Sequence, residues 1–329
     1  MMPAQHPDHA YLDTTDLTHF ARRALVTSSD EKYQPGLIIA VASALARLPV
    51  GFEVDVVVYD EGLTERTRAE LRRIVERAHT TSRLHLEQGF SQLGRDLPVA
   101  GHVTEATYSR LLIPDLSPDL ERAVYIDADL LVIDDVSELF TMDLGGAILG
   151  ACVDRDTPTV QTGVPYSWEA LDLPPDRPYF NAGMLVIDVP AWRDAGVSAA
   201  TADYALRWDD ELRCPDQEGI NAVCGGRALA LDPRFNFQMS GEVHAATAAG
   251  DARAALQGLR RAAIVHFTGC KPWLSAWFSS PAWVRAAASF WSVALASPLI
   301  SPRMRAQLLS AGAEMGAREV RRLVRRSAA

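Results

Sequence analysis

The chain has 329 residues, of which 48% are hydrophobic and 22% are charged, and its formal net charge is −10. This composition is typical of a folded globular protein and excludes a disordered or fibrous chain, while the negative charge argues against general nucleic-acid binding. Since no stretch approaches about 18 consecutive apolar residues, the sequence also excludes a membrane-spanning helix.

In chain order, the first segment is a polar stretch, residues 1–20, which lacks a secretion signal and is expected to be a flexible extension. The apolar pattern then predicts strands at 23–27, 52–59, 123–127, 147–153, 184–188 and 263–267. It predicts helices at 36–48, 64–78, 104–113, 197–211 and 216–223. This alternation is typical of a parallel sheet covered by helices on both faces, so we predict an α/β domain over 21–275 and a helical C-terminal region over 276–329.

The four cysteines, Cys152, Cys214, Cys224 and Cys270, are widely spaced. They form no C-x-x-C pair of the kind found in zinc or redox sites, and they are too few for a disulfide scaffold. We therefore expect reduced thiols and a cytoplasmic location.

Two aspartates one residue apart, Asp127 and Asp129, lie where the apolar strand 123–127 ends. Carboxylates are unfavourable beside a core unless they bind something. With this spacing the pair can hold a divalent cation such as Mg²⁺ or Mn²⁺, which favours oxygen ligands and bridges to phosphate. A solvated or capping aspartate is the alternative, but the apolar flanks favour the metal site.

A second polar group ends the strand 263–267, where His266 is followed by Gly269 and Lys271. Glycine permits a close approach of the backbone, and the lysine offers a charge suited to phosphate. A lone histidine here would be an ordinary core residue. In combination with the Gly-x-Lys turn, it indicates a corner that binds phosphate and metal.

Two further segments carry polar groups whose role stays open. Asn181 and Gly183 precede the strand 184–188, which suits either a hydroxyl-rich ligand or a plain turn. Asp216 and Gln217 open the helix 216–223, where Asp216 taken alone is interpreted as the N-cap.

Taken in order, these motifs resemble those of glycosyltransferase family 8. They are T-Y-S-R (107–110), Y-I-D-A-D (125–129), F-N-A-G-M-L-V-I-D (180–188), D-Q-E (216–218), R-F-N-F (234–237) and H-F-T-G-C-K-P-W (266–273). The resemblance spans residues 25–273. It implies a GT-A-type fold, a Rossmann-like αβα sandwich, and a retaining transfer of glucose or galactose from a UDP-sugar to an acceptor hydroxyl.

The resemblance also implies the roles of individual residues. Asp127, Asp129 and His266 would hold Mn²⁺, with Mg²⁺ as the alternative, while Gly269 and Lys271 would contact the diphosphate. The other implied donor contacts are Asp30 and Tyr33 at uracil and ribose, Arg110 near the diphosphate and sugar, and Asp154, Asn181, Asp216 and Gln217 around the sugar. Asp216 and Gln217 are the catalytic candidates. The expected acceptor is a saccharide, a lipid-linked or a small-molecule hydroxyl, and no nucleic-acid partner is expected.

Two departures from the family pattern affect single contacts. The loop after the first strand reads Asp30-Glu31-Lys32-Tyr33 where the family often has Asp-Asp-Asn-Tyr, which puts Lys32 in doubt as a base contact. The segment between His266 and Lys271 is one residue shorter than in some members, which leaves the phosphate contact of Lys271 open.

Alternatives remain for the mechanism and for the function. Retention is compatible with a covalent intermediate on Asp216 or Gln217 or with attack by the acceptor on the same face, which we favour because no carboxylate is an obvious isolated nucleophile. The main functional alternative is a non-catalytic nucleotide-sugar or glycan-binding protein. A D-x-D phosphatase is disfavoured because Leu130 and Leu131, not Gly-Thr, follow the second aspartate, and a nucleotidyltransferase because the first loop lacks glycine.

Four tryptophans, Trp273, Trp277, Trp283 and Trp291, lie within 19 residues. Core packing of a C-terminal helix is favoured over a stacking platform for the acceptor. From Arg303 onward the chain carries a net charge of +5, and residues 317–326 mix arginine with apolar residues at helical spacing. Two interpretations of this tail stay open, namely contact with an anionic membrane surface and a solvated basic tail.

Overall fold

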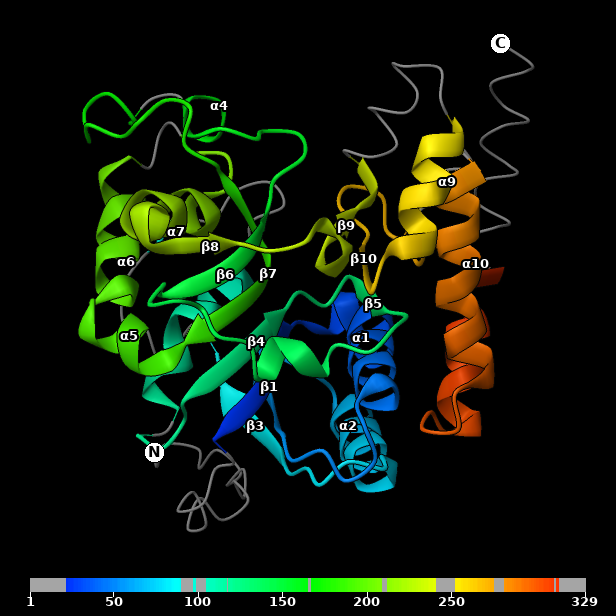
Figure 1. Cartoon of the computed structure of the whole chain (residues 1–329). Coiled ribbons are helices and arrows are strands. Elements are labelled where there is room, and N and C mark those ends of the chain that lie inside the picture. The colour runs from blue at the N-terminus through cyan, green and yellow to red at the C-terminus, as the bar shows by residue number, and fades with distance from the viewer. Residues whose placement is uncertain are drawn as a thin grey trace, which may run out of the picture.

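The computed structural model of the protein describes residues 22–89, 97–98, 105–116, 118–164, 167–208, 212–240, 252–274, 281–310 and 312–313. The expected N-terminal extension, Trp277 and the basic tail from residue 317 lie outside the described residues. Figure 1 shows a central sheet with helices on both sides and the helices α9 and α10 side by side.

The described residues form a seven-stranded sheet in the order β3-β2-β1-β4-β7-β6-β8. β7 pairs antiparallel with both β4 and β6, whereas every other neighbouring pair is parallel. The sheet is mixed, so the prediction of a parallel sheet is wrong at β7. The strands are β1 (Arg23–Ser29), β2 (Asp55–Asp60), β3 (Leu84–Gln88), β4 (Arg122–Ile126), β6 (Leu149–Val153), β7 (Phe180–Asp188) and β8 (Ala228–Ala230).

β7 begins four residues before the predicted strand 184–188. Asn181 and Gly183 therefore lie within the strand and do not precede it. In the sequence these two residues interrupt the apolar run, although the whole stretch from Phe180 to Ile187 is buried. Antiparallel neighbours need no crossover helix, and β6 and β7 pair in the sheet with residues 154–179, including a single-turn helix, between them.

The predicted helices are present with shifted ends, except over 104–113. There the short helix α3 continues as a 3₁₀ helix that runs to Asp115 and contains Pro114, which cannot donate a helical hydrogen bond. The α-helices are α1 (Gln34–Arg47), α2 (Glu65–Arg77), α3 (Glu105–Tyr108), α4 (Val160–Gly163), α5 (Val189–Asp194), α6 (Val197–Arg207), α7 (Pro215–Cys224), α9 (Ala252–Arg261) and α10 (Pro281–Ala296), and residues 302–310 are also helical.

Helices cover both faces of the sheet (Figure 1). Two large apolar clusters lie on its two sides, and a third, small cluster surrounds Val160, Val164 and Tyr179. Successive residues of a strand point to opposite faces. Val56 and Val58 of β2 accordingly pack in the cluster that contains α1, α2 and α10. Val57 and Tyr59 of the same strand pack in the cluster that contains α5, α6 and α7. This αβα layering confirms the predicted fold class.

A three-stranded second sheet follows the order β5-β10-β9. It consists of β5 (Leu130–Val132), β9 (Phe237–Gln238) and β10 (Ile264–His266). β10 lies within the predicted strand 263–267. The sequence does not predict β5, because three residues are too few to show the alternation of polar and apolar residues that marks a strand. The Ser43 hydroxyl of α1 accepts a hydrogen bond from the N–H of Val132 at 3.1 Å, which ties β5 to that helix. The Asp-Ala-Asp segment therefore spans the junction between the two sheets.

The C-terminal tryptophans pack into the core with α1. Trp273 stacks on Phe290 of α10 with a centroid distance of 5.3 Å and an interplanar angle of 24°. Trp273 and Trp283 are buried, and Trp291 is partly buried against the same cluster. Core packing is confirmed for these three tryptophans.

Among the helices of the described ranges, none has the length and apolar character that a bilayer crossing requires. All four cysteines are described and none forms a disulfide. Burial raises the pKa of the thiols of Cys152, Cys214 and Cys224 to about 12, which keeps these thiols protonated and unreactive near neutral pH.

Glu70 of α2 holds the helical segment 302–310 against the domain. Its carboxylate accepts from the N–H and from the hydroxyl of Ser301, each at 2.6 Å. We predict that Glu70→Ala lowers the free energy of unfolding by about 1–3 kcal/mol, because it leaves both donors without their partner. Urea denaturation measures this, with the exposed Glu76→Ala on the same helix as the control. Equal losses in the two variants would contradict the prediction.

Candidate active site

The candidate residues converge at one edge of the central sheet because of the strand directions. β1, β4 and β6 run the same way, and each is followed directly by an aspartate, namely Asp30, Asp127 and Asp154. β7 runs the opposite way, so Asn181 near its start lies at this same edge. Sheets of this kind bind ligands outside the carboxyl ends of their parallel strands.

Asp127, Asp129 and His266 form a cluster whose ligand atoms all lie within 4.8 Å of one another. The aspartates stand between β4 and β5, and the histidine ends β10, which pairs with β5. Oδ1 of Asp129 is buried, accepts no hydrogen bond within the described ranges and lies 3.3 Å from Nε2 of His266. A carboxylate oxygen and an imidazole nitrogen held this close are ligand atoms suited to a shared divalent cation.

Gly183 of β7 leaves the space that this cluster occupies. A Cβ there would lie 2.3 Å from Cε1 of His266 and 2.8 Å from Oδ2 of Asp127. The Gly183 carbonyl also accepts a hydrogen bond from the N–H of Asp127 at 2.8 Å. The glycine thus makes room for the cluster of Asp127, Asp129 and His266, which we call the metal cluster, whereas the sequence suggested only a turn or a hydroxyl-binding loop.

Arg110 joins this cluster to α7. Its buried guanidinium donates to Oδ1 of Asp127 at 2.9 Å and to the carbonyl of Ala182 at 2.5 Å, and its Nε lies 3.2 Å from Oδ2 of Asp216. The hydroxyl of Tyr125 donates to the same Asp127 oxygen at 2.9 Å. Burial alone would lower the pKa of Arg110, but Tyr125 and the two aspartates raise it, so the guanidinium stays charged.

Lys271 forms an ion pair with Asp129 and donates to the carbonyl of Phe267 at 2.8 Å. Burial alone would raise the pKa of Asp129, but Lys271 and His266 hold it below its ordinary range. Burial would likewise lower the pKa of Lys271, but Asp129 raises it. Gly269, which lies between Phe267 and Lys271 in the sequence, has φ +79°, a left-handed conformation that favours glycine.

Asp154, Asn181 and Gln217 form a hydrogen-bonded group beside the metal cluster. Oδ2 of Asp154 accepts from Nδ2 of Asn181 at 3.0 Å and from Nε2 of Gln217 at 3.3 Å. Its Oδ1 accepts from the N–H and the hydroxyl of Thr157 at 3.0 and 3.1 Å. These three donor-sugar candidates therefore lie together in one hydrogen-bonded group.

Asp216 lies in the first turn of α7, but the N-cap residue is Cys214, so the interpretation of Asp216 as a simple cap is wrong. The carboxylate is buried and paired with Arg110. Burial raises its pKa and Arg110 opposes this shift. A buried carboxylate with a single permanent cation beside it is suited to act on a ligand.

Asp30 and Tyr33 lie together after β1. Asp30 accepts from the N–H of Tyr33 at 3.0 Å, and the Tyr33 ring packs edge-on against Trp273 with the centroids 5.9 Å apart. Lys32 between them in sequence is exposed. Gly36 permits this packing, since a Cβ there would lie 2.3 Å from the carbonyl oxygen at position 128 and 2.4 Å from the Trp273 ring.

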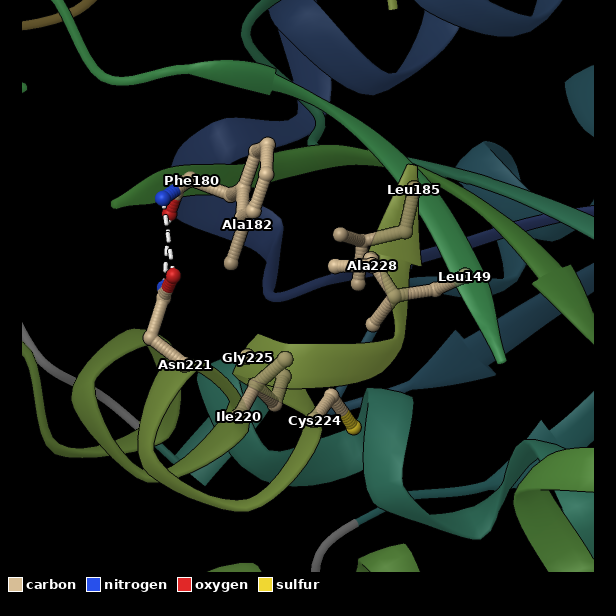
Figure 2. Close-up of a pocket in the computed structure, with 9 residues that line it drawn as sticks. All are labelled: Leu149, Phe180, Ala182, Leu185, Ile220, Asn221, Cys224, Gly225 and Ala228. Atoms are coloured by element: carbon tan, nitrogen blue, oxygen red, sulfur yellow. Dashed lines mark hydrogen bonds between the residues drawn. The ribbon is translucent and has the colours of Figure 1, made fainter. Parts of the chain in front are cut away.

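A small apolar recess separates β7 from α7 (Figure 2). Its volume of about 10 Å³ holds one water molecule at most, so it is no donor site. Figure 2 shows the Asn221 side chain bonded to both backbone groups of Phe180, accepting from its N–H at 2.7 Å and donating to its carbonyl at 2.8 Å. These two bonds anchor α7, which carries Asp216 and Gln217, to the start of β7.

Two residues of this site have no role assigned from the sequence, although both lie in motifs that carry the family resemblance. Asn236, in R-F-N-F (234–237), lies between Asn181 and His266 and is bonded to both at 2.9 Å, and no local pattern marks this role because the partners are distant in the chain. Tyr125, in Y-I-D-A-D (125–129), reads as an apolar strand position. It lies two residues before Asp127, so its side chain points to the same face of the strand, and this is the signal for its role at the aspartate.

Comparisons with known proteins agree with this geometry. Residues 24–276 match the family described as "Glycosyl transferase family 8". The chain is 27% identical over 222 residues to General stress protein A of Bacillus subtilis, covering 65% of this chain and 73% of that protein. It is 27% identical over 181 residues to the Lipopolysaccharide 1,2-glucosyltransferase of Escherichia coli, covering 54% and 52%.

A crystal structure of the galactosyltransferase LgtC in complex with donor and acceptor sugar analogs has the same fold. It aligns with a TM-score of 0.66 at 24% sequence identity, over 86% of this chain and 99% of that one. The chain spans between about half and three quarters of the length of the two curated relatives.

We predict that Gly183→Ala weakens binding of Mn²⁺ by about 10–100-fold, because the added methyl group displaces His266 or Asp127. Isothermal titration calorimetry measures the affinity. The control is Gly150→Ala in β6, where a Cβ meets only side-chain ends of Leu231 and Leu144, the closest at 3.0 Å. Wild-type affinity in Gly183→Ala would show that this glycine does not shape the cluster.

The ion pair of Lys271 predicts a pH dependence of stability. The folded-state pKa of Lys271 is raised above its value of about 10.4 in the unfolded chain. The ion pair therefore contributes fully to the free energy of unfolding below about pH 10.4, and this contribution is lost as the pH rises through the folded-state pKa. We predict that the difference in free energy of unfolding between wild type and Lys271→Met is constant from about pH 7 to 10 and shrinks above this range. Denaturant titrations in EDTA measure it, and a difference that grows above about pH 10 would contradict the assignment.

Proposed function

The chain belongs to glycosyltransferase family 8, and from this premise we propose that it transfers glucose or galactose from a UDP-sugar to an acceptor hydroxyl with retention of configuration. The observation that carries the proposal is the cluster of Asp127, Asp129 and His266 with Lys271 beside it. These groups suit a divalent cation and a diphosphate. We also propose that residues 21–275 form the catalytic domain and 276–329 a helical C-terminal region.

Asp127, Asp129 and His266 would hold Mn²⁺, or Mg²⁺ in its place. The bound ion would act as a Lewis acid that stabilises the negative charge developing on the leaving UDP. Lys271 and the backbone of Gly269 would contact the diphosphate oxygens. Since the ammonium of Lys271 is paired with Asp129 in the free protein, it would exchange one anionic partner for another when the donor binds.

The remaining residues would orient the donor. Arg110 lies between Asp127 and Asp216, so it would face both the diphosphate and the sugar. Asp30 and Tyr33 would contact uracil and ribose, with the Tyr33 ring held edge-on by Trp273. The donor-sugar hydroxyls would be bound by Asp154, Asn181, Asp216 and Gln217.

For the chemical step we favour attack by the acceptor on the face that UDP leaves. A covalent intermediate on Asp216 is disfavoured because its carboxylate is tied to the guanidinium of Arg110. The amide oxygen of Gln217 accepts from the N–H of Ala182 at 2.9 Å and is held there. Both residues would then stabilise positive charge on the sugar, and the leaving phosphate would take the proton of the acceptor.

The acceptor would be a saccharide, a lipid-linked or a small-molecule hydroxyl. A cytoplasmic location and contact of residues 317–329 with an anionic membrane stay predictions from the sequence. Family membership argues against the phosphatase and nucleotidyltransferase alternatives. The alternative that survives is a non-catalytic protein that binds a nucleotide-sugar or a glycan.

The test is release of UDP from a panel that includes UDP-glucose and UDP-galactose, with Mn²⁺ and then with EDTA. We predict slow hydrolysis of one donor that needs the metal and falls by roughly 100-fold in Asp129→Asn, which removes one charged ligand. The matched control is Asp134→Asn, an exposed aspartate five residues along the chain.

Binding of the same donors is measured on the same samples. Donor binding without turnover, even when saccharide and lipid-linked acceptors are added, would favour the binding-only alternative. Absence of both binding and turnover would contradict the proposed function.

A further inference from the structure

A continuous series of hydrogen bonds links the metal cluster to the donor-sugar group. Nδ1 of His266 lies 2.9 Å from Oδ1 of Asn236, and Nδ2 of Asn236 donates to Oδ1 of Asn181 at 2.9 Å. Nδ2 of Asn181 donates to Oδ2 of Asp154 at 3.0 Å. All four side chains are buried, so each of these bonds is needed to satisfy a polar group that water does not reach.

The direction of this series is set at the Asp154 end. An ionised carboxylate can only accept, so the NH₂ group of Asn181 must face Asp154. The N–H of Gly183 donates to Oδ1 of Asn181 at 3.1 Å, which independently fixes the same orientation of the amide. Asn236 must then turn its own NH₂ group toward Asn181, and its carbonyl oxygen is left facing His266.

At the His266 end, this direction of the hydrogen bonds fixes the tautomer of the imidazole ring. A carbonyl oxygen can only accept, so His266 must carry its proton on Nδ1 and donate it to Asn236. In the neutral ring, Nε2 then presents its electron pair to the cluster, 3.3 Å from Oδ1 of Asp129. The opposite tautomer would direct an N–H at that same oxygen and occupy the position that a cation requires.

We infer that Asn236 is a positioning residue that holds His266 in the Nδ1–H tautomer and so prepares Nε2 as a metal ligand. The inference rests on the proposed function, because it supposes that the cluster binds a divalent cation. It also makes the orientation of one metal ligand depend on the carboxylate at the sugar side, through two amide groups and no charged intermediate. Partners of this kind typically change metal affinity by about 10–100-fold.

The experiment reads the tautomer and the metal affinity separately. The protein is labelled with ¹⁵N-histidine, and the signals of His266, one of eight histidines, are identified by their loss in His266→Gln. Spectra are recorded in EDTA at about pH 8.5, above the ordinary imidazole pKa of about 6.5. Calorimetry with Mn²⁺ alone then gives the affinity of each variant.

We predict the Nδ1–H tautomer in wild type and a mixture of tautomers in Asn236→Ala, with Mn²⁺ binding weakened by about 10–100-fold. Asn236→Asp keeps an acceptor for His266 but loses the donor to Asn181, so it should keep the Nδ1–H tautomer, and the tautomer is the readout for this variant. The control is Gln34→Ala, which deletes a buried amide bonded to Met304 and outside the series. This variant should keep the wild-type tautomer and affinity.

An Nε2–H tautomer in wild type would overturn the inference, as would an unchanged tautomer in Asn236→Ala. Unchanged Mn²⁺ affinity in Asn236→Ala, beside a wild type that binds the metal, would overturn it too. Failure of the wild type to bind Mn²⁺ contradicts the metal-dependent function and with it the ligand role of His266. The two failures are therefore distinguishable.

Discussion

Buried negative charge at one edge of the sheet is the constraint on which the rest of the site depends. Asp129, Asp154 and Asp216 are each less than a tenth exposed, and an unpaired buried carboxylate is strongly destabilising. Each is stabilised differently: Lys271 pairs with Asp129, Arg110 pairs with Asp216, and amide and N–H donors surround Asp154. The same groups that stabilise these charges in the free protein are the ones suited to a metal and a diphosphate.

The strand directions bring these charged residues to the same edge of the sheet. Parallel strands end at one edge, which brings an aspartate from β4 and one from β6 together. The reversal of β7 adds an amide and the glycine that makes room for His266. The histidine itself comes from a second sheet, whose strand β5 begins three residues after Asp127. The two aspartates lie in the short turn between β4 and β5, and the histidine ends β10, so strands on both sides fix all three ligands.

Sequence reasoning predicts the parts of this arrangement that depend on local patterns. Apolar runs locate most strands, and Asp127, Asp129 and His266 are recognisable because polar residues end such runs. The direction of β7 is not local, and its first residues read as a turn because Asn181 and Gly183 interrupt the apolar pattern. The role of Asn236 is not assigned for the same reason, since its partners lie 30 and 55 residues away in the chain. Rules based on residue spacing describe one segment of the chain, whereas the direction of β7 and the contacts of Asn236 depend on segments that are distant in the sequence.

The stacking of Trp273 on Phe290 bears on the synthesis of the protein. α1 leaves the ribosome before α10, and the apolar cluster that buries α1 also includes Phe290, Ile300 and Leu308. Domains generally fold as units once their contacts are available. In the nascent chain α1 can therefore pack against β5 and α2 first, while the part of its apolar surface that faces α10 stays uncovered until that helix emerges.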